Sequence, residues 1–285
     1  MKGWCFPAPL TGIDSTRQAM TYRTIVSVIN EHSGSTVTAS YAIALATASK
    51  ARLVFYAAHP LGTSETILHH TERHLDHLFG VALEHGVAVT RITEVGQITR
   101  LLPKRVLAEN ADLVFYPLLP NERYGAPLQR QNVHQLLRSI RADLVIMRIM
   151  HMGKPHPRHI LVPLASGVPD LTRRVSFLAL LAQSFHAQIT LFHRQDDRGQ
   201  RAPTDLGKVY SALKQQHLPV LERTGTGPIA KAIALEAISR HSDLIVLGAS
   251  ERSSLRRLFF GNPSGDVMHR PPCNAVLFRA APALP

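Results

Sequence analysis

Two stretches of this 285-residue sequence match each other segment by segment. The apolar run that begins at Asp112 is followed by Arg148 after 36 positions, and the run that begins at Asp243 is followed by Arg279, again after 36 positions. Three earlier pairs of segments recur in the same order: 23–28 with 158–163, 51–56 with 187–192, and 94–98 with 225–229. Ordered matches with a shared spacing indicate that one structural unit occurs twice in the chain.

The matched segments have the pattern of buried strands, since they are short apolar runs. Between them lie stretches with apolar residues three and four positions apart, which is typical of amphipathic helices. Strands that alternate with helices of this length form βαβ units around a parallel sheet. The sequence therefore predicts an α/β protein with two tandem, doubly wound parallel sheets, each of five strands in the order 3-2-1-4-5. The predicted helices are 35–50, 65–85, 98–110, 171–186, 205–216 and 229–241.

The domain boundaries follow from the repeat and from breaks in the apolar pattern. Residues 1–19 are expected to form an N-terminal extension, because prolines and a glycine interrupt its apolar character. The first domain is expected over residues 20–150 and the second over residues 158–282. Residues 151–157 contain two prolines and a glycine and are expected to link them.

The composition favours a cytoplasmic location. Hydrophobic residues make up 45% of the chain and charged residues 18%, which is ordinary for a globular protein. No apolar run approaches the roughly 18 residues that a membrane-spanning helix needs, so we expect no membrane insertion. The two cysteines, Cys5 and Cys273, form no disulfide framework and fit a reducing compartment.

The net charge is +12, which would suit an acidic partner such as nucleic acid or an anionic membrane surface. The basic residues are scattered along the chain, however, and short groups such as Arg256-Arg257 are typical of a solvated face. The sequence carries no nucleic-acid recognition motif, so we expect no specific nucleic-acid partner.

The crevice of such a sheet lies at the carboxyl ends of the strands where strand order reverses, between strands 1 and 4 of each unit. In the second unit, strand 4 ends at Leu247-Gly248, and a glycine there permits close approach of the backbone. Gly261 opens a predicted final helix whose free N–H groups suit a phosphate, with Asn262 and Ser264 as further donors. The alternative is that both glycines serve turn geometry only.

This run resembles the C-terminal signature of the universal stress proteins. Nucleotide-binding members of that family carry Gly-x-x-Gly, nine residues, and then Gly-Ser or Gly-Thr. Here Gly248 is followed after two residues by Glu251, and nine residues later by Gly261. The resemblance implies an adenine-nucleotide-hydrolase-like fold over residues 20–282. It also implies a possible cofactor, ATP or another adenine nucleotide, with the absence of any cofactor as an equal alternative.

The second unit departs from the family pattern in ways that weaken a nucleotide site. Glu251 places a carboxylate where the family brings a glycine backbone near phosphate, and like charges repel. The family's first strand usually ends with an aspartate, whereas Pro163-Leu164-Ala165 offers no carboxylate. No catalytic or metal-binding residue is predicted. The predicted ligand-binding residues are Pro163, Leu164, Ala165, Leu247, Gly248, Ser250, Gly261, Asn262 and Ser264.

The first unit lacks the signature. Pro117 stands at the position of Gly248, and proline has no N–H and a fixed φ, so a phosphate cradle cannot form in the same way. Gly125 and Ser139 are out of register. We therefore predict that the first unit binds no nucleotide in the family manner.

Two weaker motifs suggest other chemistry. Residues 166–170, Ser-Gly-Val-Pro-Asp, resemble the pyrophosphate loop of ATP pyrophosphatases but lack one glycine and the final serine. His70, His74 and His77 share a face of a predicted helix next to His69, a spacing that could chelate a metal. The missing residues argue against a pyrophosphate loop, and a solvated polar helix face is the preferred interpretation of the histidines.

The resemblance implies a non-enzymatic tandem universal stress protein with a regulatory role in the stress response. It also implies an intramolecular pseudo-dimer in which the final strands of the two units pair, and it allows a homodimer of chains. The first alternative is an interaction module that has lost nucleotide binding and docks on a transporter or another protein. The second is an ATP-hydrolysing enzyme on the same fold.

Overall fold

The computed structural model describes residues 22–118, 127–153, 156–164, 170–195, 204–248 and 271–282, and all structural statements concern these ranges. In the first half, the strands are β1 (Thr24–Val28), β2 (Arg52–His59), β3 (Val89–Val95), β4 (Leu113–Pro117) and β5 (Asp143–Arg148), and the helices are α1 (Ser33–Ser49), α2 (Glu65–Glu84), α3 (Ile98–Ala108) and α4 (Pro127–Ser139). In the second half, the strands are β6 (His159–Leu164), β7 (Gln188–Arg194), β8 (Val220–Gly225), β9 (Leu244–Gly248) and β10 (Asn274–Arg279), and the helices are α5 (Leu171–Phe185), α6 (Thr204–Lys214) and α7 (Ile229–Ser239).

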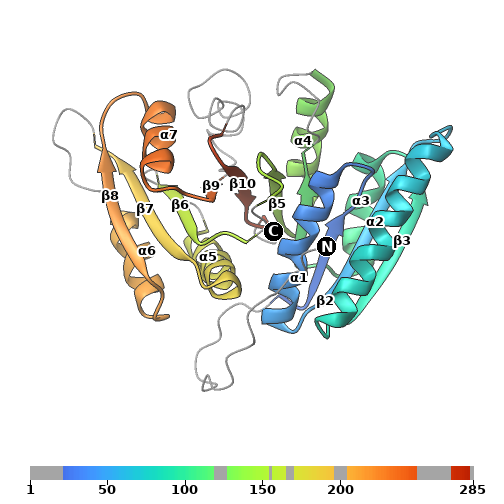
Figure 1. The fold of residues 1–285 in the computed structure, drawn as a ribbon, viewed down its shortest axis with the longest axis horizontal. Coiled ribbons are helices and arrows are strands. Elements are labelled where there is room, and N and C mark those ends of the chain that lie inside the picture. Colours follow the sequence, from blue (N-terminus) through green and yellow to red (C-terminus); the bar gives the residue numbers. More distant parts are fainter. Residues whose placement is uncertain are drawn as a thin grey trace.

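The strands form one continuous sheet in the order β3-β2-β1-β4-β5-β10-β9-β6-β7-β8. Each half of this order reads 3-2-1-4-5 from its outer edge, and pairing within each half is parallel, so the predicted fold class is confirmed. The halves meet where β5 and β10 pair antiparallel, with Leu277 opposite Ile146. Figure 1 shows β5 and β10 side by side at the centre of the molecule, with the first half on one side and the second half on the other. The expected pairing of the final strands is therefore present within the chain.

The six predicted helices all form, and their observed ends lie within two residues of the predicted ones. The predicted final helix of the second half falls on residues outside the described ranges. Both α1 and α5 end in a left-handed residue, Lys50 and His186, at φ 55° and 50°. The duplication thus extends to the way in which equivalent helices end.

The repeated aspartates have the same structural role in each half. The carboxylate of Asp112 accepts the backbone N–H groups of Arg23 and Thr24 at 2.7 and 3.0 Å. The carboxylate of Asp243 accepts the N–H groups of Arg158 and His159 at 3.0 and 3.1 Å. Each aspartate therefore ties the beginning of strand 4 to the beginning of strand 1, which accounts for this part of the sequence repeat.

Two apolar cores lie on opposite faces of the sheet. One lies beneath α1, α2, α5 and α6, and the other beneath α3, α4 and α7. Both cores run across the join, and α1 packs against α5 on one face. Across the join, the ring of Tyr41 in α1 lies 5.0 Å from the ring of Phe185 in α5, between centroids. The halves thus share their interior as well as their sheet.

Hydrogen bonds across the join use the residues at the start of each final strand. Asp143 is fully buried and accepts the Tyr22 hydroxyl and the Arg173 guanidinium, both at 2.8 Å. The equivalent residue of β10 is Asn274, whose Oδ1 accepts the N–H groups of Met150 and His151 at 2.8 and 3.0 Å.

No described helix combines the length and the apolar character needed to cross a bilayer.

Candidate functional site

The candidate site lies where β6 and β9 end, because the strand order of the second half reverses between these two strands. From β6 the sheet continues outward through β7 and β8, and from β9 it continues in the other direction through β10. The pairing of β6 with β9 is confined to Ile160–Leu244 and Leu161–Ile245, so three further residues of each strand continue without pairing to the other. An open parallel sheet binds its ligands at such a point.

Four of the predicted ligand residues lie in the described part of the chain. Leu164 and Leu247 are buried in different cores, so they fill the protein interior on opposite faces of the sheet. Pro163 and Gly248 are partly exposed at the ends of their strands. Only these two are therefore available at the edge where a ligand would lie. The other predicted residues fall outside the described ranges: Ala165, Ser250, Gly261, Asn262 and Ser264.

The backbone of Gly248 is covered by a side chain that the sequence patterns did not single out. Arg174 lies in the first turn of α5 and directs its guanidinium onto Gly248. A Cβ at position 248 would lie 1.9 Å from Arg174 Nη1 and 2.4 Å from Arg174 Cζ, which is far inside van der Waals contact. Glycine is thus required at 248 for this position of the arginine.

Sequence reasoning missed Arg174, although the helix pattern carries a signal. Arg174 precedes Phe177 and Leu178 by three and four residues, and both of these are fully buried. Residues at this spacing share one face of a helix, so Arg174 is a charged residue on an apolar stripe. A charge in such a place is rare unless it is paired or functional.

The Arg174 side chain is a buried cation. The residue is 7% exposed, and its Nε and Nη2 atoms have no hydrogen-bond partner among the described residues. Burial lowers the pKa of Arg174 to about 10, because removal from water disfavours the charged form. At neutral pH the guanidinium is still protonated. The end of β9 therefore carries a positive charge whose Nε and Nη2 donors have no acceptor within the described ranges.

Residues 156–279, which contain this site, match the model of the universal stress protein family. The second half of this chain is a universal stress protein domain. The resemblance drawn from Gly248 and Gly261 is thereby confirmed for this half. Among curated proteins, no sequence matches this chain.

Solved structures share the fold of both halves together. A universal stress protein from Archaeoglobus fulgidus DSM 4304 is 14% identical with a TM-score of 0.61, covering 89% of this chain and 97% of that one. A protein of unknown function from Pseudomonas aeruginosa PAO1 is 14% identical with a TM-score of 0.62, covering 92% and 94%. The cytoplasmic domain of a prokaryotic cation chloride cotransporter is 10% identical with a TM-score of 0.59, covering 92% and 96%. At these identities the likeness shows a common fold.

The first half differs from the universal stress protein domain at both positions of the Arg174–Gly248 contact. By the repeat spacing, Pro117 is equivalent to Gly248, and Thr38 is equivalent to Arg174. Thr38 is fully buried and donates its hydroxyl to the carbonyl of Gly34 at 2.9 Å within α1. The first half therefore has a small, satisfied side chain where the universal stress protein domain has a buried cation.

The carboxyl end of β1 is closed by contacts of the first half itself. The Asn30 carbonyl accepts the Ser35 hydroxyl at 3.0 Å and lies 2.9 Å from His74 Nδ1. The Asn30 side chain accepts the N–H of His32 at 3.0 Å. These contacts give the polar groups at this strand end partners within the chain. The prediction that this half binds no nucleotide stays a prediction.

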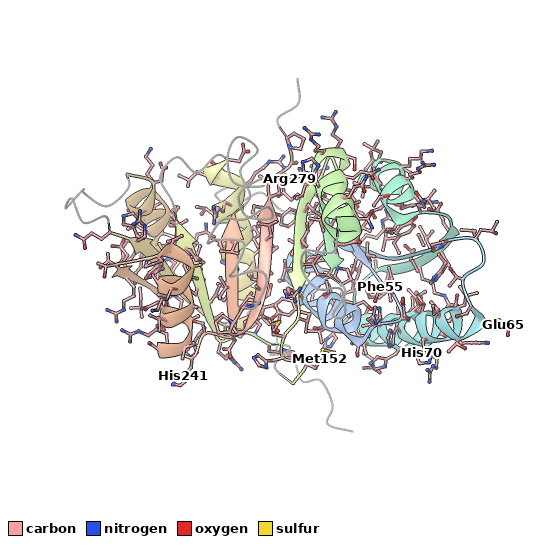
Figure 2. The ribbon with its side chains drawn as sticks, turned by 90° about the horizontal axis from the view of Figure 1, so that it is seen from above. Phe55, Glu65, His70, Met152, His241 and Arg279 are labelled. Atoms are coloured by element: carbon pink, nitrogen blue, oxygen red, sulfur yellow. The ribbon has the colours of Figure 1, made fainter. Side chains whose placement is uncertain are left out.

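The histidines of α2 do not converge. His69, His70 and His77 are exposed, whereas His74 is directed to Asn30. His70 lies at the outer surface of α2 (Figure 2). In the described part of the chain, no three metal-ligating side chains gather into a site.

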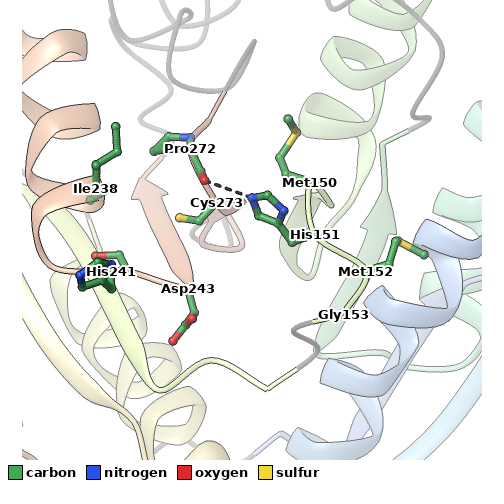
Figure 3. A pocket seen from close by; sticks show the side chains of 11 residues that line it. Met150, His151, Met152, Gly153, Ile238, His241, Asp243, Pro272 and Cys273 are labelled. Atoms are coloured by element: carbon green, nitrogen blue, oxygen red, sulfur yellow. Dashed lines mark hydrogen bonds between the residues drawn. The ribbon is translucent and has the colours of Figure 1, made fainter.

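A cavity of about 610 Å³ lies at the opposite end of the universal stress protein domain from the candidate site. Its walls are the segment after β5, the end of α7 and the segment before β10. His151 Nε2 lies 3.2 Å from the Pro272 carbonyl on this wall (Figure 3). The segment that connects the halves therefore lines this cavity. The carboxyl ends of β6 and β9, where the candidate site lies, do not line it.

Proposed function

We propose that this chain is a tandem universal stress protein, a regulatory protein of the stress response without catalytic activity. Its second domain binds an adenine nucleotide such as ATP at the carboxyl ends of β6 and β9. The observation that carries the proposal is the separation of these strands after Leu161 and Ile245, within the segment that matches the family. Such a separation at a reversal of strand order is where this class of sheet binds its ligands.

In this proposal, Pro163 lines the base side together with Ala165, whereas Leu164 supports this edge from the core beneath it. Gly248 lies on the phosphate side, where Ser250, Gly261, Asn262 and Ser264 supply further contacts. Glu251 opposes the phosphates, so the affinity is expected to be lower than for a site with glycine at that position. The first domain serves as the permanent structural partner through β5.

Calorimetric titration of ATP, ADP and AMP into the purified full chain tests this proposal, together with mass analysis of any co-purified small molecule. We expect saturable binding at about one site per chain. Gly261→Trp should abolish it by filling the predicted phosphate position. Gly125→Trp is the matched control, since it places the same bulk in the corresponding loop of the first domain. Absence of binding at millimolar nucleotide, with no carried ligand, would refute nucleotide binding.

A second candidate function is that of an interaction module that docks on another protein. It is favoured by the first half, where Pro117 ends β4 and the polar groups after β1 already have partners. The cotransporter domain that shares this fold is an example of such an arrangement attached to a transporter. A net charge of +12 would favour an acidic partner or the surface of an anionic membrane.

Cross-linking in cells followed by peptide mass analysis separates the two candidates. The docking function predicts cross-links from one recurrent partner to the first half, which a nucleotide-free variant such as Gly261→Trp retains. If two chains associate into a homodimer, the contact must use surfaces other than β5 and β10, because these strands already pair with each other.

A further inference from the structure

Arg174 has features that a purely structural residue would not be expected to have. The residue is 7% exposed, and two of the three guanidinium nitrogens lack a partner among the described residues. Burying an unpaired cation costs free energy, because the protein interior solvates charge poorly. Neighbouring Arg173 lies in the same turn but donates to the buried carboxylate of Asp143 at 2.8 Å. The two adjacent arginines thus differ: Arg173 pairs with a carboxylate, whereas Arg174 has no carboxylate partner in the part of the chain that the structure describes.

The start of the helix that carries Arg174 has no side-chain cap. The first turn of α5 contains no acidic residue, and the Asp170 side chain does not cap the helix. The first N–H groups of any helix lack intrahelical acceptors, and the helix dipole makes this end favour anions. Two arginines in the first turn reverse the usual preference. An anion at this end would accept hydrogen bonds from both the helix N–H groups and the guanidinium.

The guanidinium lies at the edge where the candidate crevice opens. It covers Gly248, the last residue of β9, and the missing Cβ of that glycine is what allows it to lie there. The equivalent positions of the first half, Thr38 and Pro117, provide neither the charge nor the space. The positive charge is therefore a specific property of the second half, which is also the half that matches the family.

We propose that Arg174 binds the phosphoryl group of the ligand at the ends of β6 and β9, assisted by the N–H groups at the start of α5, which have no acceptor within the helix. The location of the site rests on the proposed function. The chemistry does not, because a guanidinium binds any phosphoryl group through paired N–H donors. A nucleotide and free phosphate are two sources of that same group.

The test uses the full chain with four probes: adenosine, inorganic phosphate, AMP and ATP. Binding is measured by calorimetry and by the rise in melting temperature. We expect the phosphorylated probes to bind and adenosine to bind weakly or not at all. Arg174→Met should weaken phosphoryl binding by at least about tenfold, the usual loss for a charge-assisted hydrogen bond. Arg100→Met, at an exposed arginine of the first half, removes the same charge and should leave binding unchanged.

The melting temperature without ligand separates ligand binding from a structural role. If the role of Arg174 is to bind the ligand, Arg174→Met should melt at the same temperature as the natural chain or higher, because a buried charge that no described carboxylate neutralises has been removed. A fall of several degrees with unchanged phosphoryl affinity would overturn the inference. Arg174→Lys is the second variant, to be used if Arg174→Met does not fold. Lysine keeps the positive charge but lacks the paired N–H donors of a guanidinium, so weaker phosphoryl binding is again expected.

The outcomes distinguish this inference from the proposed function. Nucleotide binding that Arg174→Met leaves intact would overturn the role of Arg174 and leave the nucleotide site standing. Equal, Arg174-dependent binding of phosphate and AMP would support the role of Arg174 and identify a free anion as the ligand. Binding of AMP or ATP well above that of phosphate would support both. Absence of binding by every probe would overturn both.

Discussion

The backbone N–H of Ala281 donates to the buried carboxylate of Asp143 at 2.6 Å, although the two residues lie 138 positions apart. Asp143 begins the last strand of the first half, and Ala281 follows the last strand of the second half. The same carboxylate accepts Tyr22 and Arg173, so groups from both halves share one negative charge. The join therefore depends on a buried ion as well as on strand pairing and apolar contacts.

Asp143→Ala is expected to lower the free energy of unfolding by about 3 kcal/mol, because a buried hydroxyl, a buried N–H and Arg173 lose their acceptor together. Urea unfolding followed by circular dichroism measures this. Asp76→Ala is the matched control, since Asp76 pairs with Arg91 on the surface and should cost less than about 1 kcal/mol. Equal losses in both variants would contradict the central role of Asp143.

Gly248→Ala is expected to displace the Arg174 guanidinium, which the new Cβ would meet, and to destabilise the protein by about 1 kcal/mol, because the displaced group is the end of a flexible side chain. In an Arg174→Thr background, which supplies the residue of the first half, the same change should cost less than about 0.5 kcal/mol. Gly207→Ala in α6 is the control, since a Cβ there has no neighbour within 4 Å. A cost of Gly248→Ala that is the same in both backgrounds would count against the contact.

The side-chain hydrogen bond from Tyr56 is the largest cause of the lowered pKa of Glu94, and Arg105 lowers it further. The Tyr56 hydroxyl lies 2.5 Å from Glu94 Oε2. A lowered carboxyl pKa stabilises the folded state above the ordinary value of 4.5, and this contribution is lost as the pH falls through the folded-state value. Tyr56→Phe should therefore cost about 1 kcal/mol at neutral pH and progressively less below pH 4.5.

Urea unfolding of both proteins from pH 7 to pH 3.5 measures this difference. Tyr210→Phe removes a hydroxyl from the second half and provides the control. A difference between Tyr56→Phe and the natural chain that stays constant over the whole range would show that Glu94 does not mediate the effect.

His156 is expected to make the protein sensitive to mild acid. The imidazole stands edge-on to Phe185 at 5.7 Å between centroids, and burial, followed by the positive charge of Arg158, lowers its pKa from 6.5. Below pH 6.5 the unfolded chain therefore takes up this proton more readily than the folded chain, so stability falls as the pH falls. His156→Gln should reduce that loss by less than about 1 kcal/mol, since the ring is half-buried and partly screened. An NMR titration of the ring is the direct measurement, with exposed His69→Gln as the control for the unfolding data.

Most of the fold could be predicted because its determinants are local in the sequence. The apolar runs, the helix patterns and the common 36-residue spacing specify strands, helices and their duplication without reference to distant contacts. The repeat also marks Asp112 and Asp243, whose role in tying strand 4 to strand 1 becomes visible only in three dimensions.

The candidate site was less predictable because its main contact joins residues 74 positions apart. Arg174 and Gly248 are each ordinary in their local sequence, one on a helix and the other at the end of a strand. Their relationship arises from packing α5 over the end of β9. The family pattern associates Gly248 with a ligand. In this chain, the missing Cβ of Gly248 makes room for the guanidinium of Arg174.

The antiparallel contact between β5 and β10 has an evolutionary consequence. In a dimer of identical chains, symmetry would place the same residue on both sides of the contact. Here Asp143 and Asn274 occupy the equivalent places and hold different partners. Because one polypeptide supplies both sides, assembly does not depend on protein concentration, and neither half can lose its counterpart. Each half can therefore differ from the other without loss of the join, and Pro117 in one and Arg174 in the other are such a difference.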